Sequence, residues 1–320
     1  MRLRLHSSRS SPFHLAPLGF ALWLLAAPCV ATTYFVTISG LGGEPEYEQR
    51  FSTEAKELDK IFRNSGATVH SFLLTGPEAT FARIQQIMAE VARSSHPEDD
   101  FVLILIGHGS YDGSTYKFNL PGQDASAGDI ADMCNRIAAH RQLIVDTTSA
   151  SGAAIEALRR PGRAVIAATK SGTEKNATIF ARYWLDALED PAADTDKSGS
   201  VSALEAFTYA ATKTSAFYES QKRLATEHAV FTDARSGEAV RQASSDQGAL
   251  MSSMTLLRIG ATKAAVNDPA KHELLARKEE MEQKIDSLKY QKAAMDPADY
   301  KRQLTAALLE LARVQQELDR

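Results

Sequence analysis

Five apolar segments, separated by stretches of helical periodicity, constrain the fold of this chain more than any other feature of its sequence. They span residues 34–39, 67–74, 101–106, 142–146 and 163–168. Several, such as FVLILI at 101–106, are apolar at every position, which is typical of parallel strands covered on both faces. Between the first four, apolar residues recur every three or four positions, as on one face of a helix. The alternation predicts an α/β protein, a three-layer sandwich in which helices cover both faces of a mostly parallel sheet.

The composition and charge of the chain restrict its partners. Of its 320 residues, 44% are hydrophobic and 24% are charged, as in a globular protein with a large core. The formal charge of −4 becomes −7 if residues 1–31 are removed, because they contain three arginines and no acidic residue. A net negative charge does not favour nucleic-acid binding, so we expect no nucleic-acid partner.

The first 31 residues differ in character from the rest of the chain. They begin with three arginines, Arg2, Arg4 and Arg9, and continue into an apolar run that ends at Ala31, as in a secretory signal peptide. The run is too short to favour a membrane span, so we expect cleavage after Ala31 and a periplasmic or secreted protein. A retained anchor or a lipid on Cys29 is the alternative. Cleavage leaves Cys134 as the one cysteine, which excludes an intramolecular disulfide.

Loops rich in glycine and hydroxyl residues follow three of the predicted strands. GHGS (107–110), TTSASG (147–152) and TKSGTE (169–174) follow the third, fourth and fifth segments. The carboxyl ends of parallel strands lie along one edge of a sheet, where ligands bind. We therefore expect the three loops to converge on one rim, with His108 and Ser149 facing a shared crevice.

Two of these loops resemble the sites of the legumain (hemoglobinase) and caspase-like cysteine peptidases. In that superfamily, a strand ending in His-Gly delivers the catalytic histidine, and a second strand runs into Ala-Cys-x-Ser-Gly. The matching residues here are His108 and the run Thr148, Ser149, Ala150, Ser151 and Gly152. The resemblance covers roughly residues 33–232. It implies the fold of these peptidases and a catalytic role for His108, with Ser149 at the position of the nucleophilic cysteine.

The serine leaves three interpretations open. In the first, Ser149 is the nucleophile of a peptide-bond hydrolase, His108 is its acid and base, and backbone N–H groups near Gly109 and Ser149 stabilise the oxyanion. In the second, the site has lost turnover and the cleft binds peptide. In the third, the loops are tight turns without function. Loss of turnover is favoured, because a serine needs a base in direct contact and an orienting acid, and only Asp112 and Asp146 lie near in sequence.

Residues 194–205, DTDKSGSVSALE, fit the twelve-residue calcium loop of EF-hand proteins. The expected metal ligands are side-chain oxygens of Asp194, Asp196 and Ser198, the Ser200 carbonyl, a water held by Ser202 and both carboxylate oxygens of Glu205. With three carboxylates, the expected dissociation constant is about 10⁻⁴ to 10⁻³ M, as in extracellular modules. A structural calcium ion is therefore the expected cofactor.

The remainder of the chain divides into a linker and a helical segment. We assign the peptidase-like domain to residues 32–235 and a linker rich in Ser, Ala and Gln to 236–268. In residues 269–320, leucine and methionine recur at sevens, and Asp296 and Pro297 interrupt the pattern, which predicts a helical hairpin of coiled-coil type. An alternative function follows: a calcium-stabilised, non-catalytic assembly protein that forms homo-oligomers through the hairpin.

Several other polar residues have simpler explanations. Cys134 lies on an apolar helical face and is expected in the core. His228 is expected to be structural, and Lys170 and Glu174 are expected to be solvated loop charges rather than the lining of a substrate pocket.

Overall fold

The computed structural model describes residues 31–66, 68–234, 237–244, 247–260, 262, 265 and 268–319. Except for Ala31, the expected signal peptide lies outside the described residues, and so does Cys29.

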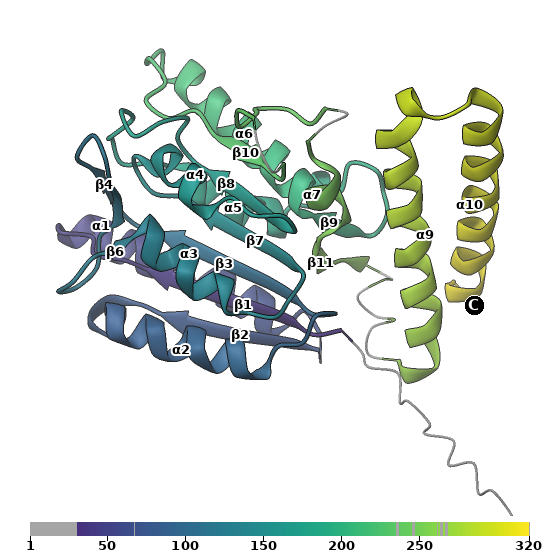
Figure 1. Ribbon diagram of the computed structural model, residues 1–320, viewed down its shortest axis with the longest axis horizontal. Coiled ribbons are helices and arrows are strands. Elements are labelled where there is room, and N and C mark those ends of the chain that lie inside the picture. Colours follow the sequence, from purple (N-terminus) through teal and green to yellow (C-terminus); the bar gives the residue numbers. More distant parts are fainter. Residues whose placement is uncertain are drawn as a thin grey trace, which may run out of the picture. The chain divides into compact units, whose positions relative to one another are not determined.

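The centre of the protein is a six-stranded, mostly parallel sheet with the strand order β10-β8-β7-β3-β1-β2 (Figure 1). Its strands are β1 (Thr33–Ser39), β2 (Val69–Leu74), β3 (Asp100–Ile106), β7 (Arg141–Asp146), β8 (Arg163–Ala167) and β10 (Val230–Thr232). The first five pair in parallel, whereas β10 is antiparallel to β8. The five apolar segments of the sequence are therefore the five parallel strands.

Alternating residues of the strands face two separate layers of helices. One face of the sheet, with Leu103 and Leu105 of β3, packs against α2 (Phe81–Ser94), α3 (Ala127–Asn135) and α4 (Ile155–Leu158). The other face, with Val102 and Ile104, packs against α1 (Pro45–Arg63), α5 (Phe180–Glu189) and α6 (Ala203–Ser220). Burial of both strand faces provides the hydrophobic stabilisation and confirms the predicted three-layer α/β sandwich.

A small antiparallel sheet lies beyond the end of β3. It consists of β4 (Gly109–Tyr111), β5 (Tyr116–Phe118) and β6 (Ala125–Ser126), and β6 leads into α3. The side chain of Ser126 accepts a hydrogen bond from the Asp129 N–H and thus starts α3 with the expected capping box. These strands were not predicted, because each has only two or three residues.

The middle of the expected linker, residues 236–268, is folded in the structure. Residues 249–258 form α7 (Ala249–Ser253) and β11 (Thr255–Arg258), and β11 pairs with β9 (Ser200–Ser202). Met251 and Met254 are almost completely buried in the layer beside α5 and α6. Their apolar contacts explain why this segment folds onto the domain despite its serine-rich flanks.

The C-terminal residues form the predicted helical hairpin. Helices α9 (His272–Gln291) and α10 (Pro297–Leu318) lie side by side (Figure 1). Asp296 caps α10 by accepting hydrogen bonds from the N–H groups of Ala298 and Asp299, as its position before Pro297 predicted. Short 3₁₀ turns complete the chain at Gly76–Glu78, Ser151–Ala154, Pro191–Ala193, Pro269–Lys271 and Lys292–Ala294. None of the helices within the described ranges has the length and apolar character needed to cross a membrane.

Candidate functional site

The predicted site residues lie at the ends of two neighbouring strands. Strands β3 and β7 are paired in parallel, with Leu105 opposite Asp146, so the loops that begin at Gly107 and Thr147 leave the sheet at the same edge. His108 and Ser149 therefore lie on one rim, and Gly109 lies between them in space.

Ser149 is held by the backbone of Gly109. Its side-chain oxygen, Oγ, donates a hydrogen bond to the Gly109 carbonyl at 3.0 Å and accepts one from the Gly109 N–H at 3.1 Å. The residue is only 2% exposed. Ala150, the next residue, has a left-handed φ of 58°, a conformation that is costly for a residue with a Cβ atom. The serine thus sits at the tip of a sharp, constrained turn.

Only glycine fits at position 109, because its backbone lies very close to the loop that carries Ser149. A Cβ atom at this position would lie 2.3 Å from the Ser149 carbonyl oxygen and 2.6 Å from Thr148 Oγ1. Any other residue would separate the loops after β3 and β7. The expected role of the Gly109 N–H as an oxyanion donor conflicts with its hydrogen bond to Ser149, because that bond already uses the donor.

The ring of His108 packs against helix α1. Its ring makes edge contacts with Tyr47 and Phe51, with centroids 4.9 and 5.1 Å apart, and it hydrogen-bonds the backbone of Gly42. Burial lowers the pKa of His108, and the nearby Arg50 guanidinium lowers it further, against the opposing effect of the Gly42 hydrogen bond. The imidazole is therefore neutral at physiological pH. In the described part of the chain, no hydrogen bond joins His108 to Ser149.

Neither nearby aspartate orients the histidine. Asp146 is fully buried at the end of β7, where Oδ1 accepts hydrogen bonds from the Thr148 N–H and the Thr148 hydroxyl. The Thr148 hydroxyl also lies 2.7 Å from the Tyr116 hydroxyl of β5. Burial raises the pKa of Asp146 to about 6, and its other oxygen has no hydrogen-bond partner among the described residues. Asp112 instead accepts hydrogen bonds from backbone N–H groups of its own turn.

A second histidine on the same rim is in direct contact with a carboxylate. His228 Nδ1 lies 2.5 Å from Glu174 Oε1, and the Glu174 backbone carbonyl accepts a hydrogen bond from the N–H of Ala150. Glu174 Oε2 also accepts from the N–H groups of Lys170 and His228. The sequence placed Glu174 in solvent, but its side chain is only 11% exposed. The pair ties the loops after β7 and β8 to the start of β10.

The expected calcium loop brings its acidic residues together. Ligand oxygens of Asp194, Asp196 and Glu205 all lie within 4.8 Å of one another. Asp194 is buried and accepts hydrogen bonds from the N–H groups of Ser198 and Gly199. Gly199 has a left-handed φ of 80°, as the sharp turn requires. These carboxylates match the oxygen-rich ligand set that calcium prefers.

Two further contacts fix the loop at its C-terminal end. Glu205 accepts hydrogen bonds from the N–H groups of Thr195 and Ser202, and it forms a capping box with Ser202 at the start of α6. Ser200 begins β9, and Val201, 1% exposed, points into the core. Ser198 and Ser200 hydroxyls lie 3.0 Å apart on the same side of the loop.

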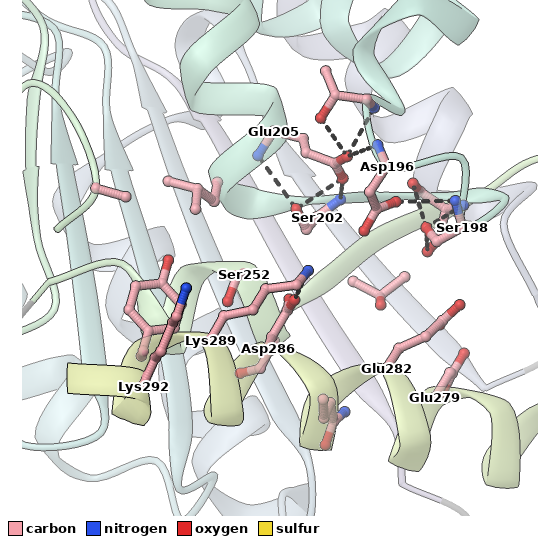
Figure 2. A pocket seen from close by; sticks show the side chains of 18 of the residues that line it. Asp196, Ser198, Ser202, Glu205, Ser252, Glu279, Glu282, Asp286, Lys289 and Lys292 are labelled. Atoms are coloured by element: carbon pink, nitrogen blue, oxygen red, sulfur yellow. Dashed lines mark hydrogen bonds and ion pairs between the residues drawn. The ribbon is translucent and has the colours of Figure 1, made fainter. Parts of the chain in front are cut away.

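This loop and helix α9 both line a cavity of about 750 Å³ (Figure 2). The loop contributes Asp196, Ser198 and Glu205 to its wall, and α9 contributes residues between Glu279 and Tyr290. The cavity is lined by none of the residues of the Ser149 rim. This cavity and the Ser149 rim are thus separate features of the described part of the chain.

The overall arrangement is similar to several solved structures. Caspase-1 from Spodoptera frugiperda matches with 11% identity over 66% of this chain and 90% of its own, with a TM-score of 0.43. The Drosophila initiator caspase Dronc matches with 12% identity over 66% of this chain and 82% of its own, at 0.41. A protein from Geobacter sulfurreducens matches with 10% identity over 72% of this chain and 99% of its own, at 0.46. No protein-family profile and no curated protein sequence matches the chain.

Proposed function

We propose that this protein has a peptidase-like architecture and binds peptide at the rim around Ser149 without cleaving it. The observation that carries the proposal is the pair of hydrogen bonds between the Ser149 hydroxyl and the Gly109 backbone. The motif order, His-Gly at the end of β3 and Ser149 at the end of β7, supports kinship with the legumain and caspase-like peptidases.

The chemistry of this arrangement opposes turnover. A serine attacks a carbonyl only when a base in contact removes its proton, whereas the Ser149 proton points to a backbone carbonyl. The neutral His108 ring contacts Tyr47 and Phe51 and hydrogen-bonds Gly42. A thiol at this position would depend less on the base, because it is intrinsically nucleophilic and partly ionised.

The test compares the wild-type protein with the Ser149→Ala variant. We expect no hydrolysis of a fluorogenic peptide library by wild type or Ser149→Ala, and binding of library peptides by both in fluorescence anisotropy. A variant that introduces bulk into the rim, Gly172→Trp, should lose binding, because Gly172 packs directly on the Tyr111 ring. Hydrolysis by wild type that disappears in Ser149→Ala would establish the peptidase interpretation instead.

We also propose that residues 194–205 bind one calcium ion. The convergence of Asp194, Asp196 and Glu205 in a loop of EF-hand type supports it. Isothermal titration should give a dissociation constant of about 10⁻⁴ to 10⁻³ M. Asp194→Asn should abolish binding, whereas Asp132→Asn, which removes an exposed carboxylate on α3, should leave it intact.

Export is the third part of the proposal, and it rests on the sequence of residues 1–31. A periplasmic or extracellular location supplies calcium at concentrations that fill a weak site. Expression of the full chain with N-terminal sequencing of the exported form should show a mature protein that starts at Thr32. Retention of residues 1–31 would contradict this expectation.

A second candidate function is assembly through the helical hairpin. Leu308 and Leu309 on α10 are 48% and 58% exposed, and apolar side chains exposed on a helix are typical of a contact surface. Sedimentation of the full chain, compared with a Leu308→Lys, Leu309→Lys variant, distinguishes a homo-oligomer from a monomer.

A further inference from the structure

One buried lysine connects the C-terminal hairpin to the calcium-type loop. Lys278 lies on α9 and is only 3% exposed. Its ammonium group donates a hydrogen bond to the backbone carbonyl of Ser198 in the loop, and it also lies 2.6 Å from Glu282 Oε1 on the next turn of α9. It is therefore a direct polar contact between the hairpin and the loop.

Burial of this ammonium requires compensating negative charge. Removing an unpaired charge from water is strongly unfavourable, even after the protein relaxes around it. Glu282 supplies one negative partner at 2.6 Å, and the loop adds the Ser198 carbonyl and the negative charge of its carboxylates Asp194, Asp196 and Glu205. The loop and Lys278 thus stabilise each other when the carboxylates are not neutralised.

The other charged groups on the α9 side of the cavity are largely balanced (Figure 2). Glu279 pairs with Arg258 of β11, and Asp286 pairs with Lys289. Glu282 pairs with Lys278 itself, in an orientation that places the ammonium against the loop. The α9 charge that touches the loop directly is therefore positive.

We propose that Lys278 is a tethered counter-cation, and that divalent-cation binding by residues 194–205 competes with docking of the hairpin. An ion held by Asp194, Asp196 and Glu205 would remove the negative field that compensates Lys278 and would repel its ammonium. The inference rests on the proposed calcium site and adds its regulation. By linkage, docking lowers cation affinity by the same factor as cation binding weakens docking.

The experiment uses the full chain and follows calcium binding and hairpin docking separately. Isothermal titration measures calcium binding, and hydrogen–deuterium exchange measures protection of α9 and α10. We expect calcium to increase exchange in α9 while α3 remains unchanged. We expect Lys278→Met to raise calcium affinity at least about fivefold. Lys284→Met, which removes an exposed charge from the same helix, should leave the affinity unchanged.

The Lys278→Met substitution leaves Glu282 without its ion-pair partner, which could itself destabilise the protein, so a second variant serves as a control. In the double variant Lys278→Met, Glu282→Gln, no charge is left unpaired, and calcium should no longer change the exchange of α9. Calcium binding without increased α9 exchange in the wild-type protein would overturn the coupling and leave the calcium site intact. Absence of calcium binding in the titration would overturn both.

Discussion

The hydroxyl of Ser149 both donates a hydrogen bond to the Gly109 carbonyl and accepts one from the Gly109 N–H, so this side chain joins the loops after β3 and β7. In this arrangement the serine side chain is a structural contact. Its proton and one of its two lone pairs form hydrogen bonds with the backbone of the neighbouring loop.

Ser149→Ala should therefore reduce stability. It removes two hydrogen bonds from a buried site, and we expect a loss of about 1 to 3 kcal/mol in the free energy of unfolding. Urea denaturation measures the loss. Ser110→Ala removes an exposed hydroxyl on β4, next to Gly109, and should change the free energy by less than about 0.5 kcal/mol. Equal effects of the two substitutions would show that the Ser149 contact contributes nothing specific.

Gly109→Ala should be more damaging. The added Cβ would lie 2.3 Å from the Ser149 carbonyl oxygen and 2.6 Å from Thr148 Oγ1, so the two loops would have to separate. We expect destabilisation of about 3 kcal/mol, the upper range for overpacking in a close contact. Thermal denaturation followed by circular dichroism measures it. Gly128→Ala in α3, where the nearest atom would be 3.7 Å away, provides the matched control and should not destabilise the protein.

Asp146 should make stability depend on pH. Its pKa is raised by burial to about 6 in the folded protein, above the usual value of 3.8, so the folded state binds the proton more tightly than the unfolded state. This contribution to stability is complete below about pH 4, falls as the pH rises toward 6, and stays low above it. Each unit of pKa difference corresponds to about 1.4 kcal/mol.

Asp146→Asn isolates this contribution from other titrating groups. The difference in unfolding free energy between wild type and Asp146→Asn, measured by urea denaturation from pH 4 to pH 7, should shift in favour of the variant as the pH rises. A difference that is constant across this range would mean that Asp146 titrates alike in the folded and unfolded chains.

The sequence predicted the sheet well because its strands carry a strong signal. The segment FVLILI is apolar throughout, and in the structure β3 is buried on both faces. The strands of the small sheet carried no comparable signal. Tyr116–Phe118, for example, owes its place to pairing with Gly109–Tyr111 rather than to a periodic pattern.

The sequence predicted where the candidate site residues lie along the sheet better than it predicted the directions of their side chains. Strand order brings His108 and Ser149 to one rim, but the direction of a side chain depends on tertiary contacts that spacing does not encode. The His108 ring packs on Tyr47 and Phe51, residues of a distant helix. Likewise, His228 and Glu174 are 54 positions apart, and only the antiparallel pairing of β10 with β8 brings them together.

Two acidic residues of the calcium-type loop, Asp196 and Glu205, should respond differently to substitution. Asp196 is exposed and accepts one hydrogen bond, from the Ser198 N–H, whereas Glu205 also caps helix α6. Asp196→Asn should thus abolish stabilisation by calcium with little change in the calcium-free protein. Glu205→Gln should abolish it and also reduce calcium-free stability by about 1 kcal/mol, through the weakened cap.

Calcium at ten times its dissociation constant should stabilise the wild-type protein by about 1.4 kcal/mol, as an increase in melting temperature. Asp132→Asn should retain the whole increase, because that carboxylate lies on α3, outside the loop. An increase that survives Asp196→Asn would place the ion elsewhere. Calcium stabilises the protein only by binding to its folded state. If the increase in melting temperature is lost in Asp196→Asn and Glu205→Gln but retained in Asp132→Asn, the ion is bound by residues 194–205.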